Sequence, residues 1–299
     1  MATPESLYKY VTAESAVTIL NTGTLRWSSP ELFDEPWSIP HEPNLGFDHF
    51  TINKVMLKTA VSMIFTRDMP PGNENHPLYK AIKRWRVEDR FKDEVEAFDA
   101  LSELLAPTPE TLEAKLKKIT SAWRDLVSNS RMVSLSESAK EPMSWRLYAD
   151  NYRGAVFKFS TEDTLANPQK VEYVSQRCRL TTIREQVDDL IGIQRAAGIE
   201  TFQLKLLTKS LDEAMEKEWR CIQIMNEEEL DCGEDVEDWY LDQPFHKSEL
   251  LSVYFGFQMT DRHRNELVGL LKSNYPSAAL FCAKQNEEQY EVDFEKLGK

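Results

Sequence analysis

Two glutamates, Glu216 and Glu218, are the first residues whose types and spacing suggest chemistry. They lie at the start of a segment with a β-like pattern that runs to Met225. If the strand reaches back to Glu216, the two side chains share one face. Two carboxylates on one face repel each other, which raises the pKa of one unless a cation or a substrate hydroxyl compensates. The alternative is a solvated charged face with Lys217 and Arg220 as neighbours.

A second cluster combines hydroxyl groups with aromatic rings. Ser134 and Ser136 occupy alternate positions of an expected strand, and Trp145 and Tyr148 lie about one turn apart on the helix-like segment that follows. A polar floor beside an aromatic wall is the usual composition of a small-molecule pocket. The alternative is that both aromatic residues belong to the core.

Histidine and cysteine give no comparable pattern. The five histidines show no i,i+4 pair and no carboxylate at zinc spacing, so we expect no metal site. The four cysteines are scattered, without a Cys-x-x-Cys pair, which argues against a disulfide framework and indicates a reducing compartment. The sequence also lacks the glycine-rich phosphate loops and the GxSxG hydrolase motif.

Charge and hydropathy exclude further classes of function. The chain has 299 residues and a formal net charge of −14, and residues 209–238 hold twelve carboxylates against three cationic side chains. This balance argues against non-specific nucleic-acid binding as the main activity, although it permits a local basic groove. No apolar run approaches the roughly 20 residues that span a bilayer, and residues 1–10 do not resemble a signal peptide. We expect a cytoplasmic protein without membrane association.

Strands that are far apart in the sequence must position these residues. Residues 7–10 and 25–28 are predicted to be short strands on either side of a helix that Thr12 caps and Gly23 ends. Further helices are predicted at 141–150, at 182–210 with a break at Gly198, and at 260–273. The later strands are predicted at 131–136, 154–160, 170–175, 218–225, 250–257, 278–283 and 289–294. We expect residues 7–10, 131–136 and 218–225 to share one sheet.

Between residues 50 and 130, apolar residues recur at steps of three and four, as in amphipathic helices. A long loop rich in proline and glycine precedes this block. We therefore predict an α+β fold with one mixed or antiparallel central sheet, in a single elaborated domain over 1–299. The block at 50–130 is predicted to be a helical insertion lobe within it, with Trp85 and Trp123 away from the pocket floor.

Short motifs occur in a fixed order over residues 7–258. They are Leu7-Tyr8-Lys9-Tyr10, Leu25-Arg26-Trp27-Ser28-Ser29-Pro30, Phe33-Asp34-Glu35-Pro36, Ser134-Leu135-Ser136-Glu137, Met143-Ser144-Trp145, Tyr148-Ala149-Asp150, Gly154, Lys209-Ser210 and Glu216-Lys217-Glu218-Trp219-Arg220. In this order the chain resembles the bacterial domain-of-unknown-function family two-nine-seven-one, which carries no settled activity. The chain departs from that family's usual residues at 34–37, at Ser144 and at Glu213.

The opening of the chain carries a second resemblance. Strand, Thr-capped helix, glycine and strand over residues 7–27 are similar to the start of DNA-targeting ADP-ribosyltransferase toxins. The resemblance implies an ADP-ribosyltransferase-like sheet with NAD as the substrate and Lys9 in the NAD pocket. It also implies a hydroxyl or aromatic position on a middle strand and a catalytic glutamate on a late strand. The residues that occur in this order are Ser134, Ser136, Tyr148, Glu216 and Glu218.

The chemistry of NAD cleavage fits these residue types. Breaking the nicotinamide–ribose bond builds positive charge on the ribose, which a fixed carboxylate stabilises. The resemblance implies that Glu218 is this catalytic carboxylate and that Glu216 orients the acceptor. Lys9 or Arg26 would hold the pyrophosphate, and Trp145 or Tyr148 would stack on nicotinamide. The other expected NAD contacts are Tyr10, Ser28, Ser134, Ser136 and Arg220.

We predict an NAD-consuming ADP-ribosyltransferase-like enzyme, or an NAD glycohydrolase, of the bacterial toxin or defence-effector type. Its acceptor would be a protein or a nucleic acid. The rival interpretation is a non-catalytic α+β module that binds a protein partner through the long loop and the acidic stretch at 227–238. Other enzymes, chiefly ones that process nucleic acid, stay open as well.

Overall fold

The computed structural model describes residues 3–33, 35, 39, 43–105, 108–177, 179–225 and 239–298. The chain divides into two compact units, which we describe separately. The sheet unit contains residues 1–39, 127–177 and 207–299, and the helical unit contains residues 40–126 and 178–206. The helical unit thus overlaps the block expected at 50–130 and also takes in a second, later segment.

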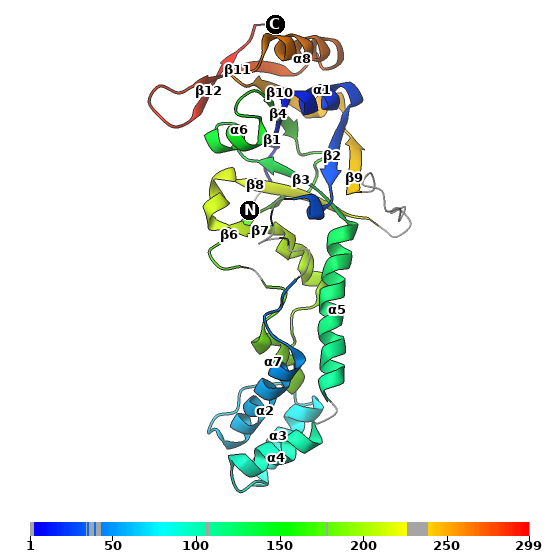
Figure 1. The fold of residues 1–299 in the computed structure, drawn as a ribbon, viewed down its shortest axis with the longest axis vertical. Helices are drawn as coiled ribbons and strands as arrows, with labels where there is room; N and C mark the ends of the chain where they lie inside the picture. Colours follow the sequence, from blue (N-terminus) through cyan, green and yellow to red (C-terminus); the bar gives the residue numbers. More distant parts are fainter. Residues whose placement is uncertain are drawn as a thin grey trace. The chain divides into compact units, whose positions relative to one another are not determined.

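The sheet unit is built around a ten-stranded sheet (Figure 1). Its main path runs β12-β11-β10-β4-β1-β3-β2-β9, while β8 pairs with β3 and β5 pairs with β8. These pairings are antiparallel except for β10 with β11, so a mixed, mainly antiparallel sheet is confirmed. The strands are β1 (Ser6–Val11), β2 (Thr24–Ser28), β3 (Ser130–Ser136), β4 (Ala155–Ser160), β5 (Gln169–Lys170), β8 (Glu218–Ile224), β9 (Tyr240–Pro244), β10 (Leu250–Phe255), β11 (Ala279–Gln285) and β12 (Val292–Lys296). A separate parallel pair joins β6 (Glu172–Val174) to β7 (Thr208–Ser210).

The sheet branches at β3. Along one edge β3 pairs with β8 over its whole length, ending with Ser136 opposite Glu218. The other edge of β3 pairs with two strands. Strand β2 pairs with it at Met132, and β1 pairs with it where Tyr8 lies opposite Ser136. The expectation that β1, β3 and β8 belong to one sheet is confirmed. The branch brings the end of β3, the start of β8 and the middle of β1 together around Ser136.

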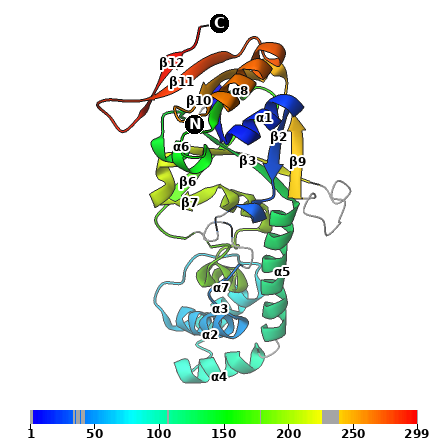
Figure 2. The same cartoon turned by 45° about the horizontal axis from the view of Figure 1, so that its top comes forward.

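In the described part of the sheet unit the α-helices are α1 (Ala13–Thr22), α6 (Pro142–Tyr148) and α8 (Asp261–Asn274). The caps that the sequence predicts are present, since the side chains of Thr12 and Thr260 accept backbone N–H bonds and Gly23 ends α1 with φ of 67°. Helices α1 and α8 lie side by side (Figure 2) and bury Leu20 and Leu267 in the main core. Short 3₁₀ helices span Pro30–Leu32 (η1), Leu211–Glu216 (η3) and Lys247–Glu249 (η5).

The helical unit contains α2 (His49–Phe65), α3 (Pro77–Val87), α4 (Glu94–Leu104), α5 (Thr108–Asn129), α7 (Ile183–Ile191) and the 3₁₀ segment η2 (Ile199–Leu207), with α5 and η2 ending at or beyond the boundary of the unit. Its core is apolar, with Ile82 and Leu101 fully buried. Trp85 packs on Phe91 and Trp123 on Phe202. A capping box between Thr182 and Glu185 starts α7. No helix among the described residues is long and apolar enough to cross a bilayer.

Candidate functional site

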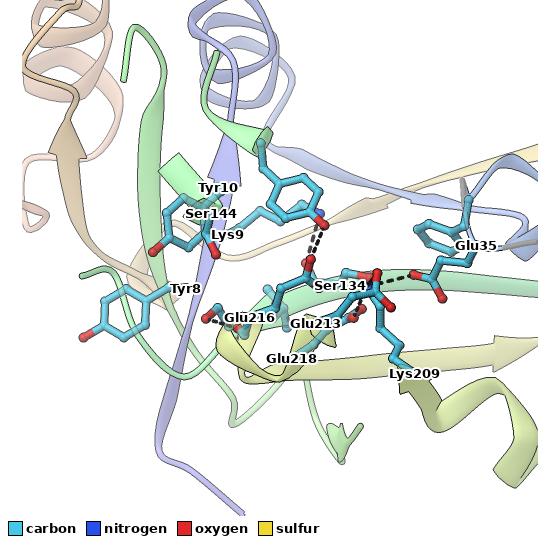
Figure 3. Close-up of a pocket in the computed structure, with 14 residues that line it drawn as sticks. Tyr8, Lys9, Tyr10, Glu35, Ser134, Ser144, Lys209, Glu213, Glu216 and Glu218 are labelled. Carbon is cyan, nitrogen blue, oxygen red and sulfur yellow. Dashed lines mark hydrogen bonds and ion pairs between the residues drawn. The ribbon is translucent and has the colours of Figure 1, made fainter. Parts of the chain in front are cut away.

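A cavity of about 320 Å³ lies within the sheet unit, at the branch of the sheet (Figure 3). This volume is near the lower end of the range for small-molecule sites. The residues that line the cavity are Tyr8, Lys9, Tyr10, Phe33, Glu35, Ser134, Leu135, Ser136, Ser144, Tyr148, Lys209, Glu213, Glu216 and Glu218. They come from β1, β3, α6, β7, η3, β8 and the segment that follows η1. No described residue of the helical unit lines it.

Lys209 is the centre of a cluster of carboxylates beside the cavity. Its side chain is 3% exposed, and its Nζ lies 2.7 Å from Glu216, 3.3 Å from Glu35 and Glu213, and 3.4 Å from Glu218. Burial alone would lower the pKa of Lys209, but the neighbouring carboxylates outweigh it and raise the pKa above its ordinary value. Lys209 is therefore a permanent cation at neutral pH.

Glu218 is held as a carboxylate anion by Arg220. Residues two apart on β8 share a face, and the Nε of the fully buried Arg220 donates to the Oε1 of Glu218 at 2.8 Å. A longer bond of 3.2 Å joins the Nη2 of Arg220 to Oε2. Burial would raise the pKa of Glu218, but the charge and hydrogen bond of Arg220, the charge of Lys209 and a hydrogen bond from Ser134 lower it overall. The cavity thus contains a fixed, ionised carboxylate.

Glu216 lines the cavity from a different element of the fold than the predicted strand. It is the last residue of η3, and Lys217 has a left-handed φ of 48° that separates it from β8. The prediction that Glu216 and Glu218 share a strand face is therefore wrong, although both line the cavity. The Oε1 of Glu216 accepts the hydroxyl of Tyr148 at 2.7 Å, and its backbone carbonyl accepts the hydroxyl of Ser136 at 2.7 Å. Burial and the bond to Glu216 raise the pKa of Tyr148.

Lys9 is the second cation of the cavity. Its Nζ donates to the backbone carbonyl of Ser134 at 3.0 Å, and among the described residues no carboxylate forms an ion pair with it. Burial lowers the pKa of Lys9, while the charge of Glu218 opposes that shift. An ammonium group has three N–H donors, so Lys9 has donors left for a ligand.

Two aromatic residues of the predicted pocket have different positions. Trp145 is fully buried in the core, where its Nε1 donates to the carbonyl of Ala139 and its ring stacks on Tyr152. It does not line the cavity, so the prediction that it stacks on a ligand is wrong. Tyr148, at 46% exposure, does line it. Tyr10 lines the cavity as well, with its hydroxyl bonded to the carbonyl of Ser138.

Arg26 and Ser28 lie outside the site. Both are on β2, which meets β3 at Met132, whereas the cavity lies where β3 reaches Ser134 and Ser136. Arg26 forms a doubly bonded, exposed ion pair with Asp242 of β9. The prediction that Arg26 or Ser28 contacts a ligand of this cavity is therefore wrong.

Two main members of the cluster, Lys209 and Glu35, belong to the ordered motifs of the sequence but were not predicted as site residues. A signal existed for Lys209, because it follows the apolar residues Leu206 and Leu207, and a lysine in a buried segment requires an anionic partner. Glu35 has no local signal, since its partner Arg220 is 185 residues away.

The described part of the chain contains no group of three or more histidine, cysteine or acidic side chains arranged to hold a metal ion. The acidic stretch at 227–238, predicted to bind a partner, lies outside the described residues. No protein family model, no curated protein and no solved structure matches this chain. Both family resemblances therefore stay predictions, and functional inference depends on the geometry of the cavity.

Proposed function

We propose that this cavity binds NAD and that the protein cleaves the nicotinamide–ribose bond, as an ADP-ribosyltransferase-like enzyme with an ADP-ribosyltransferase-like sheet. The observation that carries the proposal is Glu218, a buried carboxylate whose pKa is lowered and whose position Arg220 fixes at the cavity wall. Such a group can stabilise positive charge that develops in a transition state without reorganising.

In the proposed reaction the bond between the ribose carbon and the nicotinamide nitrogen breaks, and its electron pair leaves with nicotinamide. The ribosyl cation is then captured by a nucleophile of a macromolecular acceptor or by water, which gives up a proton. Glu218 accepts a hydrogen bond from a ribose hydroxyl, and this bond strengthens as the cation forms.

The other cavity residues have supporting roles in this proposal. Lys9, with donors left for a ligand, binds the pyrophosphate. Tyr148 stacks on the nicotinamide ring, and Ser134 and Ser136 line the ribose position with Tyr10. Glu216, which Tyr148 and Lys209 hold, orients the acceptor.

The test is incubation with NAD, with mass analysis for free nicotinamide and for a mass gain on added macromolecules. The Glu218→Gln variant is expected to lose at least about two orders of magnitude in NAD cleavage while it still binds NAD. Glu216→Gln is expected to reduce transfer more than hydrolysis. The matched control is Glu249→Gln, because Glu249 is also buried in the sheet unit but bonds to Thr164, away from the cavity.

Full turnover by the Glu218→Gln variant would contradict the proposal. So would calorimetry that detects no NAD binding by the unmodified protein. Either result would favour a binding module whose cavity has no catalytic role.

A further inference from the structure

Glu35 places a carboxylate on the two buried cations of the cluster. Both of its oxygens lie against the Nη2 of Arg220, at 2.6 and 2.7 Å, and its Oε1 is 3.3 Å from the Nζ of Lys209 (Figure 3 labels Glu35 and Lys209). We propose that Arg220 and Lys209 form an anion subsite for one phosphate of a dinucleotide's diphosphate, and that Glu35 occupies this subsite when no ligand is bound.

Glu35 differs from the two buried glutamates of the cluster in how it is held. Glu216 ends η3 and also bonds to Tyr148, and Glu218 lies on β8 with the Nε of Arg220 as its partner. Glu35 lies outside the regular helices and strands, and among the described residues its carboxylate contacts Arg220 and Lys209 alone. Of the two carboxylates that bind Arg220, Glu35 is therefore the one that can leave with the fewest other bonds broken.

Replacement of the Glu35 carboxylate by another anion is energetically more favourable than its loss without a replacement. The guanidinium of Arg220 is completely buried, and removing one partner of a buried ion pair is strongly destabilising. Glu35 can therefore leave when another anion takes its place. A phosphate suits the position, because it presents several oxygens and a larger charge than a carboxylate to the planar guanidinium.

Lys9 makes a diphosphate the better ligand than a single phosphate. Its ammonium lines the same cavity and has donors left, so one phosphate would bind Lys9 while the other replaces Glu35. This inference deepens the proposed function, since the diphosphate would be that of NAD. It can nevertheless be tested without any reaction.

The experiment is calorimetry of magnesium-free pyrophosphate binding, with orthophosphate as the second titrant. Glu35→Gln removes the competing charge and is expected to bind pyrophosphate at least about tenfold more tightly than the wild type. The affinity for orthophosphate should increase less, because a single phosphate cannot reach both Lys9 and the position of Glu35. The control is Glu31→Gln, which removes the same charge from η1, where the carboxylate has no ion pair among the described residues, and it should bind as the wild type does.

Glu35→Asp covers the case in which Glu35→Gln fails to fold. It keeps the charge of the cluster but withdraws the carboxylate by one methylene, and it should bind pyrophosphate at least about threefold more tightly than the wild type. Wild-type affinity in a folded Glu35 variant would overturn the subsite. If Glu35 controls pyrophosphate binding but NAD is not cleaved, the subsite stands and the proposed function fails. Cleavage of NAD with no effect of Glu35 on pyrophosphate would remove the subsite alone.

Discussion

Buried charge distinguishes the two units of this protein. Among the described residues of the sheet unit, the buried charged residues are Arg131, Lys209, Glu216, Glu218, Arg220 and Glu249. In the helical unit the buried polar side chains among the described residues are Thr181 and Gln186, and both are uncharged. Salt bridges occur in the helical unit as well, but with partly exposed partners such as Lys83 and Glu74.

The difference indicates where the chain is shaped by something other than stability. Burying an ion pair is costly, and apolar side chains of similar volume often stabilise a fold as well or better. The helical unit avoids that cost, whereas four of the buried charges named for the sheet unit, Lys209, Glu216, Glu218 and Arg220, belong to the cluster at its cavity. Clusters of this kind, with shifted pKa values in a cleft, are typical of functional sites.

Removing the central cation should have the largest effect on stability. Lys209→Met leaves the carboxylates of Glu216 and Glu218 buried with one cation fewer, so we expect the free energy of unfolding to fall by about 3–5 kcal/mol. Urea unfolding followed by circular dichroism measures it. Lys83→Met, at an exposed pair, is the control and should unfold at the wild-type midpoint. If Lys209→Met were as stable as the wild type, the expected difference in stability contribution between the buried charges of the sheet unit and the exposed ion pairs of the helical unit would be contradicted.

Truncating a core residue of the helical unit should lower the free energy of unfolding by about as much, but without removing a charge. Leu101 is fully buried in α4, and Leu101→Ala is expected to destabilise the protein by about 3 kcal/mol through lost burial and a cavity. Its effect should be equal at pH 4 and pH 7, in contrast to that of Lys209→Met. Leu104→Ala, at an exposed position of the same helix, serves as the control.

The pH dependence of stability should come from the sheet unit. The pKa of Glu218 is lower in the folded protein than in the unfolded chain, where it is about 4.3. Its contribution is complete above pH 4.3 and is lost as pH falls through the folded pKa, with a slope of at most about 1.4 kcal/mol per pH unit. Glu218→Gln should therefore show a shallower loss of stability in acid than the wild type. If the stability of both proteins fell equally steeply in acid, a group other than Glu218 would cause the acid sensitivity.

The smallest effect is expected at Arg26. Its ion pair with Asp242 is about half exposed, so Arg26→Ala should change the free energy of unfolding by no more than about 1 kcal/mol. The variant should also keep wild-type NAD cleavage and pyrophosphate binding, because β2 does not reach the cavity. A loss of either activity would extend the site beyond the cluster.

Local signals predicted much of the fold. The caps at Thr12 and Thr260 and the left-handed Gly23 are properties of a few adjacent residues, and the helices they bound were predicted from them. Apolar periodicity likewise predicted the helices between residues 49 and 129. The strand β9 was missed, because Tyr240–Pro244 is short, ends in proline and contains two polar residues.

The site was harder to predict, because its contacts are long-range. A left-handed lysine at position 217 has no sequence signature, and that residue moves Glu216 from the strand into η3. The partnership of Glu35 with Arg220 joins segments that no spacing rule connects. Trp145 and Tyr148 belong to one short helix, but Trp145 lies in the core and Tyr148 lines the cavity. This difference depends on the strands against which the helix packs.

The sheet unit is assembled from three separate stretches of chain, and this affects its biosynthesis. Strands β1 and β4 pair over six residues, but β4 also needs β10, which begins 90 residues after β4 ends at Ser160. At about 5–20 residues per second of translation, that edge of β4 stays unpaired for on the order of 5–20 s. During this interval an apolar strand edge is open to aggregation, so the nascent chain should be a good substrate for ribosome-associated chaperones.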